Sequence, residues 1–312
     1  MARRGPSDIN LLVGIDKPVG MSSQDAVSRV RRALDERRVG HAGTLDPLAS
    51  GVLVVGVGQA TRLLGMLALD RKTYLARIAF GSETSTDDEE GEIVRRVGSA
   101  PELLDEHFAR GVLEGFEGEQ LQVPPAYSAI SVDGRRSYER ARAGEEVELP
   151  ARPIEVFSAE LISLDEDDEG PVWTVSFEVS KGTYVRALAR DIGRAAGGAA
   201  HLCALQRTAS GAVRLGACLP LEGLDRDAAR ASMLDPVLAL GLAARTLSEE
   251  ELDDVLCGRA IGLGDGFPEG VAPSEGDRVA LTAKGELRAI AVAEAGRLRM
   301  DTVFPQGIGG VR

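Results

Sequence analysis

The stretch Gly40-His41-Ala42-Gly43-Thr44-Leu45-Asp46-Pro47-Leu48-Ala49-Ser50-Gly51 runs directly into the apolar segment 52–57. A short apolar segment bounded by glycines is typical of a buried strand, so we expect a loop that leads into the core. Pro47 biases Asp46 toward an extended backbone, and the glycines allow close approach of a ligand or another segment. The pattern predicts one carboxylate held in a fixed geometry, although an aspartate that caps a turn fits the spacing as well.

The composition is that of a globular protein with room for two domains: 312 residues, 44% hydrophobic and 27% charged. No segment approaches the roughly 20 apolar residues that a membrane span needs, and residues 1–6 do not begin a secretory signal. Three scattered cysteines, Cys203, Cys218 and Cys257, predict reduced thiols and a cytoplasmic location. A zinc site that combines them with His201 lacks the usual close spacing.

A net charge of −13 argues against a nucleic-acid partner, but the charges are unevenly distributed. Basic residues gather in two segments, 29–38 and 181–214, which leaves a basic face possible. The acids gather in three runs, which we interpret as solvated loops. For Asp87-Asp88 a metal site is the alternative, although no calcium-loop pattern surrounds it. The acidic runs are 87–90, 165–169 and 249–251.

Periodicity predicts a mixture of helices and strands. Apolar residues recur at helical spacing from 26 to 34, after possible N-caps at Ser22 and Ser23, and again from 185 to 196. Alternation predicts strands over 74–80 and 173–179. Because the order shows no regular βαβ repeat, the sequence favours an α+β fold over a doubly wound sheet.

The character of the chain changes near residue 247. A helical segment over 248–257 precedes a Gly/Pro-rich stretch, and then 278–281 and 287–293 read as a hairpin around Lys284-Gly285. Residues 298–304 predict a further strand. We therefore expect a domain over residues 1–240 and a small β-rich domain over 241–312.

Six motifs go beyond these general patterns. In chain order they resemble the signatures of the tRNA pseudouridine synthase B family, and the resemblance is close over residues of about 10 to 215. The motifs are residues 14–23 (GIDKPVGMSS), the stretch 40–51, 72–74 (KTY) with 81–87 (GSETSTD), 124–129 (PPAYSA), 182–186 (GTYVR), and His201 with Leu205.

The resemblance implies a pseudouridine synthase fold, with a mixed, largely antiparallel central sheet flanked by helices and a PUA-like C-terminal domain. It implies an isomerase that converts uridine 55 in the T loop of tRNA into pseudouridine, without a cofactor or a metal ion. It also implies that the T stem-loop of tRNA is the partner. We expect no guide RNA, no membrane, no obligate protein partner and a monomer in the cytoplasm.

The resemblance also implies roles for individual residues. Asp46 matches the nucleophile, and Arg186 matches the arginine that pairs with it. Attack at the sugar, attack at the base and a glycal route all stay open. Tyr74 matches the tyrosine that stacks on the target base, and its hydroxyl is a candidate general base.

Other matched residues concern RNA binding. Tyr184 and Leu205 match residues around the flipped nucleotide, and His41 matches a residue that helps to open the loop. Such a role fits RNA recognition, in which unstacked bases are splayed out and stacked on rings. Lys17 and the basic segment 181–214 would hold phosphates.

The chain departs from the family pattern at two positions, where Ser131 and Gln206 replace residues that are commonly basic. Two other classes of function stay open beside a stand-alone synthase. One is a non-catalytic RNA-binding module with the same fold. The other is the related RNA-guided enzyme of ribonucleoprotein complexes, against which the acidic balance argues.

Overall fold

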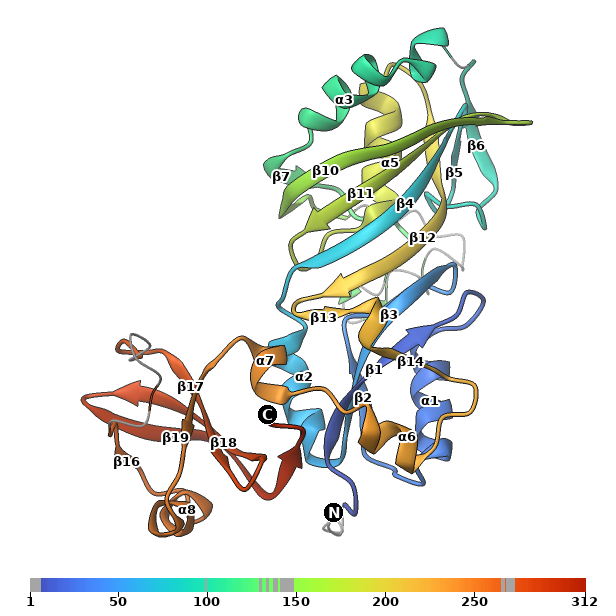
Figure 1. Cartoon of the computed structure of the whole chain (residues 1–312). Coiled ribbons are helices and arrows are strands. Elements are labelled where there is room, and N and C mark those ends of the chain that lie inside the picture. The colour runs from blue at the N-terminus through green and yellow to red at the C-terminus, as the bar shows by residue number, and fades with distance from the viewer. Residues whose placement is uncertain are drawn as a thin grey trace. The chain divides into compact units, whose positions relative to one another are not determined.

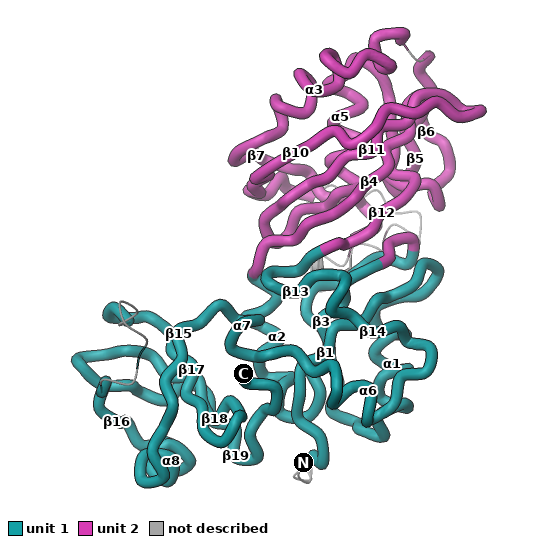
Figure 2. Tube along the Cα trace, in the orientation of Figure 1, with its two compact units in different colours: residues 1–47, 51–69, 209–312 teal, residues 48–50, 70–208 magenta. Residues whose placement is uncertain are grey.

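The structure is a computed structural model. It describes residues 7–98, 100–128, 131–132, 135–136, 140, 149–264, 267 and 273–312. The chain forms two compact units (Figure 2). Unit 1 contains residues 1–47, 51–69 and 209–312, and unit 2 contains residues 48–50 and 70–208.

The N-terminal part of unit 1 is built on strand β1 (Figure 1). This strand pairs antiparallel with β3 and parallel with β14, and β2 pairs antiparallel with β3. The strands are rich in Val, Leu and Ile, and most of those side chains are fully buried, as expected for strands covered on both faces. The elements are β1 (Leu11–Lys17), β2 (Val39–Ala42), β3 (Ala49–Val57), η1 (Gly58–Leu63), α2 (Leu64–Leu67), β13 (Val213–Arg214), η3 (Leu215–Ala217), β14 (Cys218–Pro220), α6 (Arg226–Ala231) and α7 (Pro236–Leu240).

Helix α1 (Ser23–Ala33) begins with a capping box. The Ser22 side chain accepts a hydrogen bond from the Asp25 amide, and the Asp25 carboxylate accepts one from the Ser22 amide. The Ser22 hydroxyl also donates to the Asp25 carboxylate, and this bond, with the one from the Ser22 amide, lowers the pKa of Asp25. The reciprocal bonds fix the residue at which the helix begins and the direction in which the chain enters it.

The C-terminal part of unit 1 is a five-stranded sheet in the order β15-β17-β18-β19-β16. The β17–β18 hairpin turns at Lys284-Gly285, where both residues have positive φ, as a tight hairpin turn requires. Leu12 and Val54 of the N-terminal strands share one hydrophobic cluster with Ile290 and Phe304 of this sheet. Its elements are β15 (Ala243–Thr246), α8 (Glu249–Leu256), β16 (Ile261–Gly262), β17 (Arg278–Ala283), β18 (Glu286–Glu294) and β19 (Arg297–Gly309).

Unit 2 contains the strand order β12-β4-β11-β10-β7 (Figure 1). Strand β4 pairs antiparallel with β11 over eight residue pairs, and Trp173 of β11 is fully buried against Phe80 of β4. Helix α5 packs against β4 and helix α3 against β10. The elements are β4 (Lys72–Phe80), β5 (Ser82–Thr84), β6 (Ile93–Arg96), η2 (Pro101–Leu104), α3 (Glu106–Glu114), β7 (Gly118–Gln122), β8 (Ser131–Val132), β9 (Arg135–Arg136), β10 (Arg152–Asp167), β11 (Gly170–Val179), α5 (Val185–Ala195) and β12 (Ala200–Ser210).

The elements that the sequence predicts are present, and several are longer than predicted. The strand expected within 52–57 begins at Ala49, and the one expected over 298–304 spans Arg297–Gly309. The predicted α+β class, with a mixed, largely antiparallel sheet and a β-rich C-terminal sheet, is confirmed. The boundary at residue 240 stays a prediction.

Candidate active site

The Asp46 loop joins β2 to β3 in unit 1, and hydrogen bonds hold its backbone on both sides of Asp46. The Ser23 hydroxyl accepts a hydrogen bond from the Leu45 amide at 2.8 Å and donates one to the Leu45 carbonyl at 3.0 Å. The amide of Gly20 donates to the Pro47 carbonyl at 2.8 Å. Ser23 and Leu45 are buried, whereas Asp46 is partly exposed. The loop therefore presents one carboxylate on a fixed backbone, as the sequence predicts.

Lys17 fixes the turn after β1, and this turn contacts the Asp46 loop. Its side chain is fully buried, and its ammonium group donates to the carbonyls of Pro18 (2.9 Å) and Met21 (2.8 Å). Both carbonyls belong to the turn that carries Gly20, and this turn holds Pro47. A fully buried ammonium group does not fit direct contact with a phosphate. The structure instead gives Lys17 a role in positioning the turn.

His41 lies in β2 opposite Val55 of β3 and is partly exposed. It therefore stands on a paired strand, five residues before Asp46. Both residues lie in unit 1, and the predicted role of His41 in opening the RNA loop stays a prediction.

Two predicted pocket residues lie on neighbouring strands of unit 2. Tyr74 of β4 stands opposite Phe177 of β11, and Leu205 lies on β12, which pairs with β4. Each keeps about 8% of its surface exposed. Lys72 shares the buried face of β4 with Tyr74, and its burial lowers the pKa of this amine to about 8. The sequence patterns did not single out Lys72 as a separate site residue.

Tyr184 is the N-cap residue of α5, and its backbone is held by the side chain of Gln122. The Tyr184 amide donates to Oε1 of Gln122 at 2.9 Å, and Nε2 of Gln122 donates to the Tyr184 carbonyl at 3.1 Å. Gln122 is nearly fully buried at the end of β7. Sequence reasoning missed this residue, because the two partners lie 62 positions apart.

Arg186 follows within the first turn of α5 and is buried. Its guanidinium group donates to the carbonyls of Thr86 (2.8 Å) and Tyr127 (3.1 Å) and lies 3.4 Å from Oδ2 of Asp88. Asp88 is also buried and accepts hydrogen bonds from the Thr86 hydroxyl and the Glu90 amide. Two chain segments, the loop at 86–88 and the segment at Tyr127, thus fix the orientation of this arginine.

The neighbouring Asp87 forms a second buried ion pair, with Arg190 at 2.9 Å. Arg190 also donates twice to the carboxylate of Asp191. Burial raises the pKa of Asp87 to about 6, although Arg190 and Arg186 oppose this shift. The interpretation of residues 87–90 as a solvated loop is therefore wrong for Asp87 and Asp88, because both carboxylates serve internal arginines.

The predicted basic face over 181–214 is largely wrong for the same reason. Arg186 and Arg207 are buried, and Arg190 is engaged with two carboxylates. Arg194 forms two hydrogen bonds with Glu83, and these bonds lower the pKa of that carboxyl. Of the six cations, Lys181, Arg194 and Arg214 are exposed, and Arg194 is paired with Glu83. The alternation of charge along the sequence could not distinguish internal from external arginines.

The predicted site residues therefore fall into two groups. Asp46, His41 and Lys17 belong to unit 1, whereas Tyr74, Tyr184, Arg186 and Leu205 belong to unit 2. The pairing of Arg186 with Asp46 stays a prediction. The chain departs from the family pattern at Gln206 and Ser131. Gln206 lies on β12 next to Leu205 and is partly exposed. Ser131 lies in β8, of which the structure describes the backbone.

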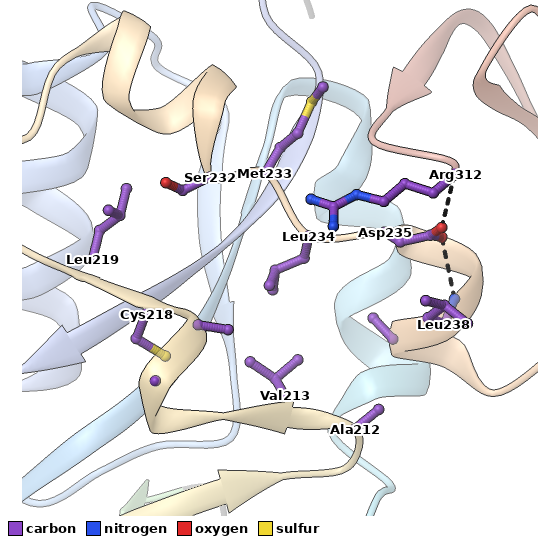
Figure 3. A pocket seen from close by; sticks show the side chains of 13 residues that line it. Ala212, Val213, Cys218, Leu219, Ser232, Met233, Leu234, Asp235, Leu238 and Arg312 are labelled. Atoms are coloured by element: carbon purple, nitrogen blue, oxygen red, sulfur yellow. Dashed lines mark hydrogen bonds between the residues drawn. The ribbon is translucent and has the colours of Figure 1, made fainter.

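A separate cavity of about 380 Å³ lies in unit 1, lined mainly by residues of β13, η3, β14 and α7 (Figure 3). Its wall is mostly apolar, with Cys218, Met233 and Leu234 among its residues, and none of the predicted site residues lines it. Asp235 at its edge caps α7 through the amides of Val237 and Leu238 and accepts a hydrogen bond from the Arg312 amide. The Asp235 carboxylate is thus engaged in holding the fold.

Among the residues that the structure describes, no group of three or more His, Cys, Asp or Glu side chains is arranged to hold a metal ion. Within the same residues, no helix combines the length and the hydropathy that a bilayer crossing demands.

Comparison with known proteins identifies the family. A model of the TruB family pseudouridylate synthases (N-terminal domain) matches residues 31–185. The tRNA pseudouridine synthase B of Arthrobacter sp. (strain FB24) is 43% identical over 297 residues, which cover 94% of this chain and 96% of the relative. The chain belongs to the TruB family of pseudouridylate synthases. The tRNA pseudouridine synthase B of Mycobacteroides abscessus, another relative, is 44% identical over 251 residues, which cover 80% of this chain and 84% of that protein.

Membership of the TruB family confirms the resemblance and the predicted enzyme class, an isomerase that forms pseudouridine. Solved structures show the same fold. A chain in the structure of an H/ACA RNP bound to a substrate RNA containing 2'-deoxyuridine superposes with a TM-score of 0.70 at 23% identity, covering 94% of this chain and 84% of that chain. A chain of a Cbf5-Nop10-Gar1 complex gives a TM-score of 0.69 at 25% identity, with the same coverage.

Proposed function

We propose that this TruB family member converts uridine 55 in the T loop of tRNA into pseudouridine, with Asp46 as the nucleophile. The observation that carries the proposal is the Asp46 loop, whose peptides on both sides of the carboxylate are fixed by Ser23 and Gly20. Relatives that are 38–44% identical over most of this chain are named tRNA pseudouridine synthase B. Those names support tRNA as the substrate.

The reaction is an isomerisation, so its atoms balance without a co-reactant. The N1–C1′ bond of uridine breaks and the C5–C1′ bond forms, while the proton that leaves C5 is balanced by one that N1 gains. A carboxylate can assist by adding to the sugar or to the base, or by taking a proton on a glycal route. All three need Asp46 ionised beside the substrate.

Arg186 supports that ionised state in our proposal. A guanidinium group close to a carboxylate favours its charged form, which opposes the effect of burial. Arg186 is itself fixed by Asp88 and by two carbonyls, so it offers a charge that needs no reorganisation during the reaction.

Tyr74, Tyr184 and Leu205 would hold the uracil after it leaves the stack, with Tyr74 stacking on the base and offering its hydroxyl to the late proton transfer. Chemistry on a base requires its removal from the helix, at a cost of a few kcal/mol. His41, on the strand that leads to Asp46, would occupy the space that the flipped nucleotide vacates. A pocket of rings and apolar side chains offsets part of that cost.

We propose further that the enzyme works without a cofactor, a guide RNA or an obligate protein partner, as a monomer in the cytoplasm. The solved H/ACA structures contain other components, and these belong to those assemblies. A transcript tRNA with no other RNA present should therefore be a sufficient substrate.

The test is to map pseudouridine in transcript tRNA incubated with the purified protein. We expect one modified site, at position 55, and none when uridine 55 is replaced by cytidine. The Asp46→Asn variant should bind the tRNA with similar affinity and form no pseudouridine. Near-normal turnover by that variant would refute the nucleophile, and unmodified tRNA with the native protein would favour a non-catalytic RNA-binding role.

A further inference from the structure

The second basic segment of the sequence forms a cleft that the proposed chemistry does not use. The cleft lies at the end of α1 and the start of β2, within unit 1, and has a volume of about 630 Å³. Four of the nine residues that line it are arginines. The lining residues are Arg31, Arg32, Asp35, Glu36, Arg37, Arg38, Val39, Gly40 and Thr61.

The backbone that carries these arginines is well fixed. Asp35 has a positive φ of 43°, and the Glu36 amide donates to the Arg31 carbonyl, which ends the helix in a tight turn. The Glu36 carboxylate accepts a hydrogen bond from the Arg38 amide at 2.7 Å. The Arg38 carbonyl in turn accepts one from Gly58. The cleft is therefore part of the folded unit, and one of its two acids is engaged in forming the turn.

The four arginines of the cleft outnumber its two carboxylates, Asp35 and Glu36. In the part of the chain that the structure describes, none of the four forms an ion pair with a carboxylate, in contrast to Arg186, Arg190 and Arg194. Arg226 of α6 adds a further cation, because its guanidinium group donates to the carbonyls of Leu34 and Asp35. In a chain with a net charge of −13, a cleft with an excess of arginines that form no ion pair indicates an anionic partner.

Two of the four arginines also stabilise helix α1. Arg31 and Arg32 lie in the last turn of α1, where cations complement the helix dipole. Arg31 also donates to the Val39 carbonyl at 2.8 Å. Arg37 lies beyond the helix and is exposed, as is Arg32. Neither side chain forms a hydrogen bond or an ion pair with the described residues, so both are free to contact a ligand.

We infer that this cleft binds backbone phosphates of the tRNA substrate outside the target loop. The inference rests on the proposed function. Arginine presents a planar fork that matches a phosphate in a bidentate manner, and several such forks in one open cleft fit a polyanion. Strand β2 connects the cleft to the Asp46 loop, and the four residue steps from Arg38 to Ala42 span about 13 Å. One RNA whose loop lies at Asp46 can therefore reach the cleft with its stem.

The test uses the full chain with Arg32→Gln and Arg37→Gln together, and measures the Kd for tRNA over a series of KCl concentrations. Loss of two phosphate contacts should lower the magnitude of the slope of log K against log salt by about 2. It should also raise the Kd at low salt by about tenfold or more. The R32K/R37K variant keeps both charges and should restore most of the slope.

The matched control is Arg96→Gln with Arg152→Gln, two exposed arginines of unit 2 that form no ion pair among the described residues. It removes the same charge from the protein and should leave the slope as in the native chain. An unchanged slope in the Arg32/Arg37 variant would overturn the inference, as would an equal change in the control. A higher Kd with an unchanged slope would overturn it as well, because lost phosphate contacts must release fewer counterions. Failure of the native protein to modify uridine 55 would instead count against the proposed function, and tRNA binding would still report on the cleft.

Discussion

Arg186 and Asp88 form a buried ion pair, with 3.4 Å between Nη1 and Oδ2, and both side chains are further held by hydrogen bonds from or to the segment 84–90. Asp88 therefore fixes the arginine that we propose to act on Asp46. Removing one partner of a buried ion pair leaves the other charge buried without its counter-charge. The resulting loss of stability exceeds the net stabilisation that the intact pair provides.

Asp88→Asn should lower kcat by about tenfold or more, since a charge-assisted hydrogen bond contributes roughly 1.5–3 kcal/mol and 1.4 kcal/mol is a factor of ten. The Kd for tRNA should change little, because Asp88 is buried and would not contact RNA. Single-turnover kinetics with saturating tRNA and a separate binding measurement distinguish the two. The exposed Asp168→Asn is the control for loss of a carboxylate. A rise in Kd with unchanged kcat would contradict the positioning role.

Ser23→Ala should loosen the Asp46 loop. The substitution removes both hydrogen bonds to the Leu45 peptide and leaves its buried amide without this partner, at a cost of about 1–3 kcal/mol in the free energy of unfolding. We expect kcat to fall more than the affinity for tRNA. Ser28→Ala on the same helix is the matched control, because the Ser28 hydroxyl bonds to the Gln24 carbonyl within the helix. If both substitutions change the free energy of unfolding in urea and kcat equally, the Ser23 hydroxyl does not position the Asp46 loop.

These contacts mark the limit of what the sequence alone can predict. Helix α1 and strand β11 were predictable because their apolar residues recur with periods near 3.6 and 2. Strand β12 was not predicted, since the buried polar residues His201 and Arg207 interrupt its apolar alternation. The motif order identified the Asp46 loop, but no local pattern shows that Ser23 holds it.

The acidic run shows the same limit for charge. Asp87 and Asp88 look like part of a solvated loop because their partners, Arg190 and Arg186, lie about 100 residues further along the chain. Charge patterning reports on neighbours in sequence, whereas ion pairs depend on the folded arrangement of β5, the loop after it and α5. The motif resemblance selected Arg186 but could not assign Asp88 to it.

Gln122→Ala should displace Tyr184, because the glutamine amide is the clamp that both donates to and accepts from the Tyr184 backbone. Two net hydrogen bonds of about 1 kcal/mol each predict a fall in kcat/KM of up to about 30-fold. Gln120→Ala, two residues earlier on β7, is the control, since that side chain bonds to the Phe116 carbonyl. If both variants keep native kcat/KM for tRNA, the clamp does not position a residue of the site.

The buried pair of Asp87 and Arg190 predicts a dependence of stability on pH. The pKa of Asp87 is raised to about 6 in the folded protein from 3.8, so the folded state holds the proton more tightly than the unfolded state. Stability from this group is therefore fully present below pH 3.8 and is lost as the pH rises through about 6. A shift of about two pKa units corresponds to roughly 3 kcal/mol.

Asp87→Asn removes this titration. The unfolding free energy of the native protein relative to the variant should therefore increase as the pH is lowered from 7.5 toward 4.5, by an amount of order 1–3 kcal/mol. Urea unfolding of both proteins at several pH values measures the difference, and pairwise subtraction cancels the titration of all other groups. The opposite trend, with the native protein gaining on the variant as the pH rises, would mean that the ion pair with Arg190 outweighs burial and holds the pKa of Asp87 below its ordinary value.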